Sequence, residues 1–226
     1  MKIKILSKKY LGENAERYDM RRSSGVKWKK EQLTFETLIK NIPKKSKIID
    51  VPVGTGRFID LYKKYQMDVS GIDMSEDMLR ECAKKAEIQN YPVYLKQGSI
   101  FNIEYKDNSF DVAVCIRFLN WINTRDFELA ISELCRVANE HLIIGIRNYT
   151  SLKDFALSYQ GAAGIARQII RRAYKIVNRE GLVVHAKKHI FKTFKKHDLN
   201  IVRSVCIERS ANGTEYYFYF LRKNNI

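Results

Sequence analysis

The feature that most constrains the fold of this chain is a glycine-rich turn directly after a short apolar run. Residues 48–53 are mostly β-branched and follow a lysine-rich stretch, which predicts a parallel strand buried on both faces. Gly54 and Gly56 lack a Cβ, so the backbone of the turn can adopt positive φ values and approach a ligand closely. A helix is expected at 57–65. This order of strand, glycine turn and helix predicts a nucleotide site at the edge of a parallel sheet.

Two acidic residues accompany the turn. Asp50 lies in the first strand, and Asp73 ends a second predicted strand at 69–72, where a carboxylate can accept both hydroxyls of a ribose. A dinucleotide site would need a third glycine where Ile59 stands, and Asp50 would repel a pyrophosphate. An acid ahead of the glycines instead favours a ligand with a positively charged end.

The segment resembles motif I of the class I S-adenosylmethionine-dependent methyltransferases, Asp/Glu-x-Gly-x-Gly-x-Gly. Pro52 stands at the first glycine, which is similar to an Asp-x-Pro-x-Gly-Thr-Gly variant in bacterial members. The resemblance continues through 74–79, 98–100 and 109–112, and covers about 48–147. It implies S-adenosylmethionine as the cofactor and S-adenosylhomocysteine as the product.

The same resemblance implies a set of cofactor contacts. Asp50 would lie near the amino group of the cofactor, and Asp73 would bind its ribose. Ser99 stands where many members have an Asp that contacts adenine, so the backbone at Ile100 is the alternative contact. The implied cofactor-binding positions are Asp50, Pro52, Gly54, Thr55, Gly56, Asp73, Met74, Met78, Ser99 and Ile100.

Strand and helix patterns alternate along the chain, which predicts an α/β fold with a doubly wound, mostly parallel, seven-stranded sheet. Ser75 and Thr124 are the expected N-caps of two helices, the first ending near Gln89. Three further strands are expected at 93–96, 110–116 and 141–147. The tail predicts a helix at 187–196 and an antiparallel hairpin of 201–208 and 215–221 around a turn at 212–213.

One domain of 226 residues accommodates these elements. We expect a basic helical cover at 1–47, a cofactor-binding core at 48–147, a helical lid inserted after the fifth strand at 148–190, and the C-terminal hairpin at 191–226.

Positive charge is segregated along the chain, whose formal net charge is +16. Residues 1–47 hold 14 basic and 5 acidic residues, residues 48–147 hold 12 and 15, and residues 148–226 hold 15 and 5. A lysine-rich, AT-rich genome explains the total but not the segregation. The two flanks usually cover the acceptor site in this fold, so the charge favours an anionic acceptor or an anionic surface.

The lid contains a basic amphipathic pattern at 161–179. Arginine or lysine recurs every fourth residue from Arg167 to Arg179, opposite an apolar side that includes Ile165 and Ile169. Three interpretations stay open: a solvated lid over the site, a contact with RNA or another polyanion, and a peripheral membrane contact.

The N-terminal cover interleaves aromatic and guanidinium side chains. Tyr18, Arg22 and Trp28 are candidates to touch the cofactor or the acceptor, and Arg22 could pair with the cofactor carboxylate bidentately. The alternative is a surface helix on which Tyr18 and Trp28 pack against the core.

Residues 115–121 follow the fourth strand, where a parallel sheet faces its ligand crevice. Arg117, Asn120 and Trp121 are therefore expected near the place of methyl transfer. Arg117 is also a candidate cofactor contact, and the alternative for Trp121 is a place in the core. The segment lacks the Asn/Asp-Pro-Pro-Tyr/Phe motif of enzymes that methylate amino groups of DNA bases, and no Pro-Cys nucleophile occurs in the chain. The candidate catalytic residues are Tyr18, Arg117, Asn120 and His185.

The sequence gives little support for a metal site or a membrane-spanning segment. His185 and His189 are four residues apart on a possible helix, but solvated surface histidines are the preferred interpretation, and no metal is expected. No run approaches a membrane span, and no secretory signal is apparent at 1–10. The four cysteines lie in apolar stretches, which is typical of buried, reduced thiols and favours a cytoplasmic protein.

The expected function is methyl transfer to an oxygen or nitrogen of a small, anionic molecule or glycan. The alternatives are an RNA methyltransferase that uses the basic flanks, a lyase that acts on S-adenosylmethionine, and a cofactor-binding module without transferase activity.

Overall fold

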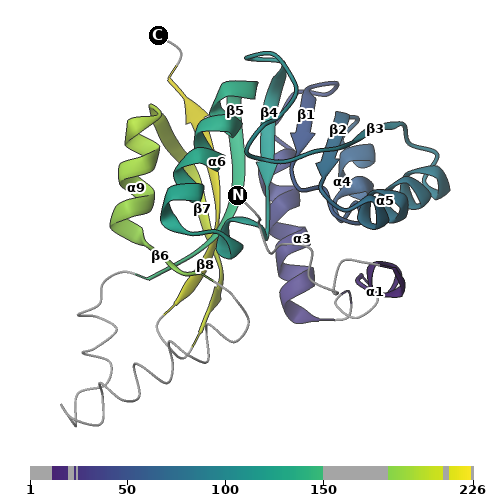
Figure 1. The fold of residues 1–226 in the computed structure, drawn as a ribbon, viewed down its shortest axis with the longest axis horizontal. Helices are drawn as coiled ribbons and strands as arrows, with labels where there is room; N and C mark the ends of the chain where they lie inside the picture. Colours follow the sequence, from purple (N-terminus) through teal and green to yellow (C-terminus); the bar gives the residue numbers. More distant parts are fainter. Residues whose placement is uncertain (1–11, 20–22, 24, 150–182, 211–213, 225–226) are drawn as a thin grey trace.

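The computed structural model describes residues 12–19, 23, 25–149, 183–210 and 214–224, which form one sheet with helices on both faces (Figure 1). The strands are β1 Lys47–Asp50, β2 Asp68–Asp73, β3 Val93–Gln97, β4 Phe110–Cys115, β5 Ala138–Tyr149, β6 His185–Ala186, β7 Leu199–Arg209 and β8 Glu215–Lys223. The helices are α1 Glu13–Glu16, α3 Val26–Ile39, α4 Ile59–Lys64, α5 Glu76–Ile88, the 3-10 turn η2 Leu119–Trp121, α6 Thr124–Val137 and α9 Lys187–Lys196.

The sheet has the order β3-β2-β1-β4-β5-β8-β7. Strands β1 to β5 pair in parallel, and β8 runs antiparallel between β5 and β7, so the predicted α/β fold with its C-terminal hairpin is confirmed. The predicted count of seven strands is wrong, because β6 makes an eighth by pairing in parallel with the end of β5. A strand of two residues is too short to show a periodic pattern, so β6 could not be predicted.

Two predicted helix caps have different outcomes. The Ser75 hydroxyl accepts a hydrogen bond from the Met78 N–H at 3.3 Å, which confirms it as the N-cap of α5. The predicted cap Thr124 is wrong: Asn123 caps α6 instead, and its Oδ1 accepts from the Asp126 N–H at 3.0 Å. Both residue types favour caps, so adjacent candidates cannot be separated by type alone.

Apolar side chains fill both faces of the sheet. On one face, α6 contributes Phe127 and Leu134, and α9 contributes Ile190 and Phe194. On the other, Phe35 and Leu38 of α3 pack with Tyr62 of α4 against strand residues that include Ile48 and Val112. The alternation of β-branched strands and amphipathic helices therefore produces the expected layers, helix, sheet and helix.

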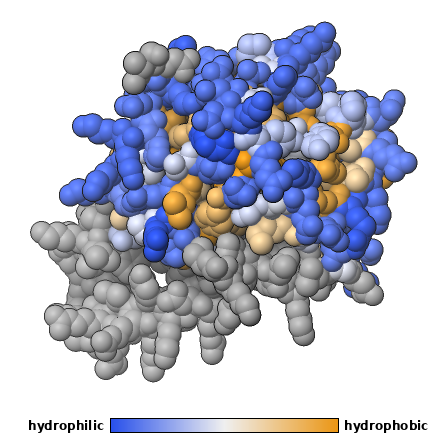
Figure 2. Space-filling model, turned by 45° about the horizontal axis from the view of Figure 1, so that its top comes forward, coloured by the Kyte–Doolittle hydropathy of each residue, from blue (hydrophilic) through white to orange (hydrophobic). Residues whose placement is uncertain are grey.

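The described surface is mostly hydrophilic, with a smaller apolar area on the face that Figure 2 shows. Within the described ranges, no helix is both long and apolar enough to cross a bilayer. All four cysteines are free thiols; Cys82, Cys115 and Cys135 are buried as expected, whereas Cys206 is only half-buried. The basic pattern at 161–179, Arg22 and the turn at 212–213 lie outside the described residues.

Candidate functional site

The glycine turn after β1 has the backbone that the sequence predicts. Gly54 and Gly56 have φ values of +58° and +71°, in the left-handed region that favours glycine, and the Val51–Pro52 peptide is cis. The Gly56 N–H donates to the Val53 carbonyl at 3.1 Å, which closes the turn. Helix α4 begins three residues later, at Ile59.

The two glycines differ in what surrounds them. A Cβ at Gly56 would lie 2.5 Å from Ile59 Cδ1 and 2.8 Å from Cys82 Sγ, whereas a Cβ at Gly54 would meet no atom within 4 Å. We expect Gly54→Ala to lower the free energy of unfolding by about 1 kcal/mol, through φ alone. Gly56→Ala should lower the free energy of unfolding by about 1–3 kcal/mol more than this, because the added methyl group would overpack the space beside Ile59 and Cys82. Urea denaturation of both variants checks this, and equal losses would contradict it.

Asp73 holds the turn against the end of β2. Its Oδ2 accepts the Gly54 N–H at 2.9 Å, and its Oδ1 accepts the Ser75 N–H at 2.9 Å. Burial raises the pKa of this carboxyl, although the backbone N–H donors oppose the effect. Because a carboxylate has about four lone pairs, both oxygens retain acceptor capacity for a ligand at this edge.

Asp50 is buried at the end of β1, and its partner is a residue that the sequence did not suggest. The Tyr62 hydroxyl of α4 donates to Asp50 Oδ2 at 2.8 Å. Burial raises the pKa of Asp50 from 3.8 to about 7, and the nearby Asp73 carboxylate adds to this, while the Tyr62 hydrogen bond opposes it. The carboxyl therefore changes protonation near neutral pH.

This raised pKa predicts a pH-dependent stability. Between pH 3.8 and about 7 the folded protein retains a proton on Asp50 that the unfolded chain has released, so the stability falls as the pH rises through this window. Asp50→Asn cannot ionise and should gain stability relative to the native protein as the pH rises. Thermal unfolding of both proteins across the window checks this, with Asp60→Asn on the exposed side of α4 as the control. A stability difference that is constant with pH would contradict the prediction.

The other predicted cofactor positions gather around Asp73. The Gly98 N–H donates to the Asp73 carbonyl at 3.0 Å, which brings Ser99 and the buried Ile100 beside the end of β2. Met74 follows Asp73 directly, and Met78 is buried in the first turn of α5. Pro52 and Thr55 lie in the glycine turn itself. The structure thus brings together at one edge the residues 50–56, 73–78 and 98–100.

Thr55 has a partner in the N-terminal cover. Its hydroxyl donates to Asp19 Oδ1 at 2.7 Å, and Asp19 Oδ2 forms an ion pair with Lys85 of α5. Asp19 was not among the sequence candidates, although its neighbour Tyr18 was. Tyr18 is half-buried and lies near Arg117. Its electrostatic interaction with Arg117 stabilises the positive charge of the guanidinium group.

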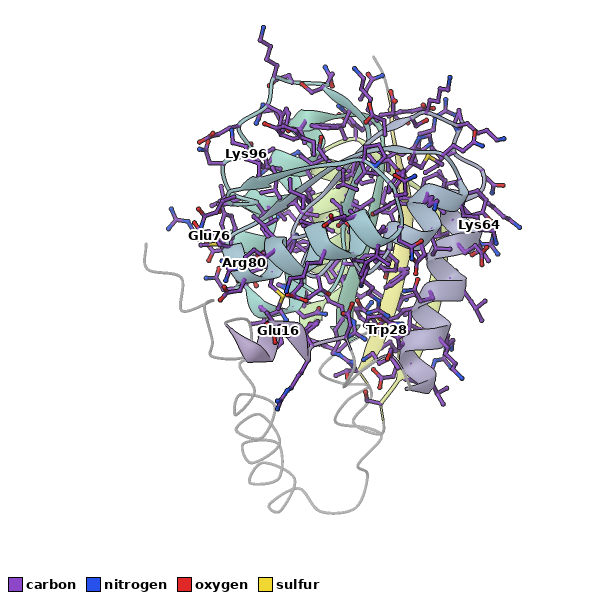
Figure 3. All side chains as sticks on the ribbon, turned by 90° about the vertical axis from the view of Figure 1, so that its right-hand side faces the viewer. Glu16, Trp28, Lys64, Glu76, Arg80 and Lys96 are labelled. Atoms are coloured by element: carbon purple, nitrogen blue, oxygen red, sulfur yellow. The ribbon has the colours of Figure 1, made fainter. Side chains whose placement is uncertain are left out.

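Arg117 and Trp28 belong to a buried ionic cluster centred on Glu31 of α3. Glu31 is fully buried; Arg117 Nη2 lies 2.8 Å from its Oε2, and Arg57 pairs with the same oxygen. The Arg57 guanidinium stacks over the Trp28 ring at 3.8 Å from its centroid. Figure 3 shows Trp28 and Glu16 at the same edge of the molecule. Burial lowers the pKa of Arg57 to about 10 despite Glu31.

A second carboxylate beside this cluster also bridges two cations. Glu208 of β7 lies 2.5 Å from Arg147 Nη2 and 2.6 Å from Lys27 Nζ. Both cations also lie over the ring of the buried Tyr216, with distances to its centroid of 5.7 Å and 5.1 Å. The residues come from α3, β5, β7 and β8, so no local sequence pattern could predict that they lie together.

Two catalytic candidates are buried in the framework. Asn120 accepts the Arg147 N–H on its Oδ1 at 2.6 Å and the Val183 N–H on its carbonyl at 2.6 Å, so it links η2 to both ends of the segment 147–183. His185 lies in β6, not in a helix, and only 1% of it is exposed, so its interpretation as a solvated surface histidine is wrong. Its Nε2 lies 2.9 Å from the Leu119 carbonyl, and its ring packs 4.7 Å from that of Phe127. Burial lowers its pKa.

Among the residues that the structure describes, no three or more histidine, cysteine, aspartate or glutamate side chains lie close enough together to hold a metal ion.

Comparisons with known proteins agree with this geometry. A family described as "Methyltransferase domain" matches residues 48–141. YqeM of Bacillus subtilis, which carries a methyltransferase name, is 31% identical over 87 residues, 38% of this chain and 35% of that protein. A carboxy-S-adenosyl-L-methionine synthase of Campylobacter hominis is 28% identical over 118 residues, 50% of this chain and 49% of that protein. The chain thus matches between a third and a half of the length of these curated relatives.

Solved structures match over a larger share of the chain. Magnesium protoporphyrin IX methyltransferase from Synechocystis PCC 6803, with bound SAH, has a TM-score of 0.71 at 15% identity, covering 96% of this chain and 97% of that one. The [4+2]-cyclase SpnF has a TM-score of 0.66 at 14% identity, covering 85% and 80%. At these identities the likeness establishes the fold, which is shared by proteins with different reactions.

Proposed function

We propose that this chain, whose residues 48–141 carry a methyltransferase domain of the class I fold, transfers a methyl group from S-adenosylmethionine to an oxygen or nitrogen atom of a small anionic molecule or glycan. The observation that carries the proposal is the contact between Asp73 and the Gly54 N–H at 2.9 Å, which joins the predicted ribose carboxylate to the glycine turn. We assign the turn, with Pro52 at its first glycine position, to the Asp-x-Pro-x-Gly-Thr-Gly variant of motif I.

The residues at this edge fit such a cofactor. The space beside Gly54 is open, since a Cβ there would meet no atom within 4 Å, and both Asp73 oxygens can accept further hydrogen bonds. The cofactor supplies an activated sulfonium methyl when bound. The protein then contributes mainly orientation of donor and acceptor, and Tyr18 and Arg117 are the candidates that lie together beside the carboxyl end of β4.

The anionic acceptor is supported by the charges beside this edge. Four cationic side chains, Lys27, Arg57, Arg117 and Arg147, share two carboxylates, Glu31 and Glu208. The cluster therefore carries excess positive charge in a partly desolvated place, where an anionic group would be bound more strongly than in water. The basic pattern at 161–179 stays a prediction for a lid, a polyanion contact or a membrane contact.

Calorimetry and product analysis test the proposal. We expect S-adenosylmethionine and S-adenosylhomocysteine to bind and NAD not to bind. Labelled methyl transfer to a panel of carboxylates and phosphates should exceed transfer to their neutral esters; preference for the esters would remove the anionic acceptor. NAD binding without S-adenosylhomocysteine binding would overturn the cofactor assignment.

The same measurements separate the alternatives. Formation of methylthioadenosine would indicate a lyase, and binding without turnover on any acceptor would indicate a binding module. An RNA methyltransferase would show RNA affinity that falls with salt, with a log–log slope of about −0.7 for each phosphate neutralised on a single strand.

A further inference from the structure

Asp19 connects the two walls of the proposed cofactor crevice. One carboxylate oxygen accepts the Thr55 hydroxyl at 2.7 Å, and the other forms the ion pair with Lys85. Thr55 stands between Gly54 and Gly56 in the turn after β1, whereas Lys85 belongs to α5, the helix after β2. A nucleoside in an open parallel sheet binds between such a turn and the end of the next strand.

The segment around Asp19 is itself attached to α5. We call residues 12–19 the N-terminal strap. The Gly12 N–H donates to Asp77 Oδ2 at 2.8 Å, and only 1% of Ala15 is exposed. Figure 3 shows Glu16, in α1, below and to the right of the α5 residues Glu76 and Arg80. The strap therefore rests on α5 along its length and ends, at Asp19, on the glycine turn.

The contacts of Asp19 are partly shielded from solvent. The Asp19 and Lys85 side chains are 24% and 29% exposed, and Thr55 is only 3% exposed. In contrast, Lys84 is 59% exposed in its pair with Glu81 on the same helix. A charge-assisted hydrogen bond to a nearly buried hydroxyl is shorter and stronger than a neutral one, so Asp19 fixes the Thr55 side chain and, with it, the turn.

We propose that Asp19 is a positioning residue that holds the strap on the glycine turn and thereby slows the release of bound cofactor. The inference rests on the proposed function, because it assumes that the cofactor lies between the turn and α5. Opening the strap breaks the bonds to Thr55 and Lys85 together, so the closed strap retains the ligand. The effect lies in the dissociation rate, because an opened strap leaves Asp73 and the glycine backbone in place.

Stopped-flow measurement of S-adenosylhomocysteine binding to the full chain tests the proposal. Asp19→Ala should release the ligand about tenfold faster than the native protein, with an association rate that is unchanged or higher. Lys85→Met and Thr55→Val should each produce part of this increase without altering Asp19. Adding Lys85→Met to Asp19→Ala should have no further effect, because the contact is already lost. Glu81→Ala, which breaks the neighbouring pair on α5, is the matched control and should leave the rate unchanged.

The outcomes separate the two proposals. If the native protein binds no S-adenosylhomocysteine, the proposed function falls and the role of Asp19 falls with it. If the native protein binds but Asp19→Ala, Lys85→Met and Thr55→Val all release the ligand at the native rate, only the role of Asp19 is overturned. Should Asp19→Ala fail to fold, the other two variants decide the question, with their thermal midpoints measured alongside.

Discussion

Replacing Asp73 with alanine is expected to weaken S-adenosylhomocysteine binding at least tenfold, or about 1.4 kcal/mol. The carboxylate accepts the N–H groups of Gly54 and Ser75 at 2.9 Å each, so its loss removes the link between the turn and the start of α5. It also removes the group proposed to accept the two ribose hydroxyls. Isothermal titration of the native and variant proteins measures the effect.

The control for Asp73 lies on the same strand. Asp68 begins β2 at its opposite end and is exposed, so Asp68→Ala changes the net charge equally without touching the turn. Its affinity for S-adenosylhomocysteine should equal that of the native protein. An unchanged affinity in Asp73→Ala, with Asp68→Ala also unchanged, would show that the nucleoside binds elsewhere.

Replacing Glu31 with alanine is expected to lower the free energy of unfolding by about 3–5 kcal/mol. Glu31 is fully buried and pairs with both Arg57 and Arg117, whose side chains are 10% and 24% exposed. Without it, two guanidinium groups face each other in a place with little water, and their solvation is not recovered. Urea denaturation followed by circular dichroism measures the loss.

Two further variants make this prediction specific. Glu36 lies on the same helix α3 and pairs with Lys64, which is 59% exposed, so Glu36→Ala should change the stability little. Adding Arg117→Gln to Glu31→Ala should recover part of the loss, because it removes one of the two unpaired charges. Similar losses in Glu31→Ala and Glu36→Ala would mean that Glu31 is not an electrostatic anchor of the N-terminal cover.

The fold and the cofactor edge could be predicted because their signals are short-range. The turn at 54–56 and Asp73 follow from β-branched runs, glycine and a carboxylate within 26 residues. The cap of α5 also follows from one residue, Ser75. Each of these depends on physical preferences that act between near neighbours in the chain.

The ionic contacts could not be predicted because they join distant segments. Glu31 follows two lysines and has the pattern of an exposed helical residue; it is buried because Arg57 and Arg117 approach it from loops 26 and 86 residues away. Asp19 meets Thr55 and Lys85 across 36 and 66 residues. His185 is followed, after Ala186, by two lysines in the sequence, which favours an exposed position. It is nevertheless in the core, because β6 pairs with β5 and places His185 opposite Asn148.

The pairing of β6 with the end of β5 affects which changes in chain length the fold can accept. Asn148 pairs with His185, and the Val183 N–H donates to the carbonyl of Asn120, so residues 148 and 185 lie side by side in the framework. The free-energy cost of closing a loop grows slowly with its length, by about 0.6 kcal/mol for each doubling. The stretch between these two points can therefore be lengthened, shortened or exchanged with that of another protein while the framework keeps its register. We expect chimaeras joined at 148 and 185 to fold and to retain S-adenosylhomocysteine binding.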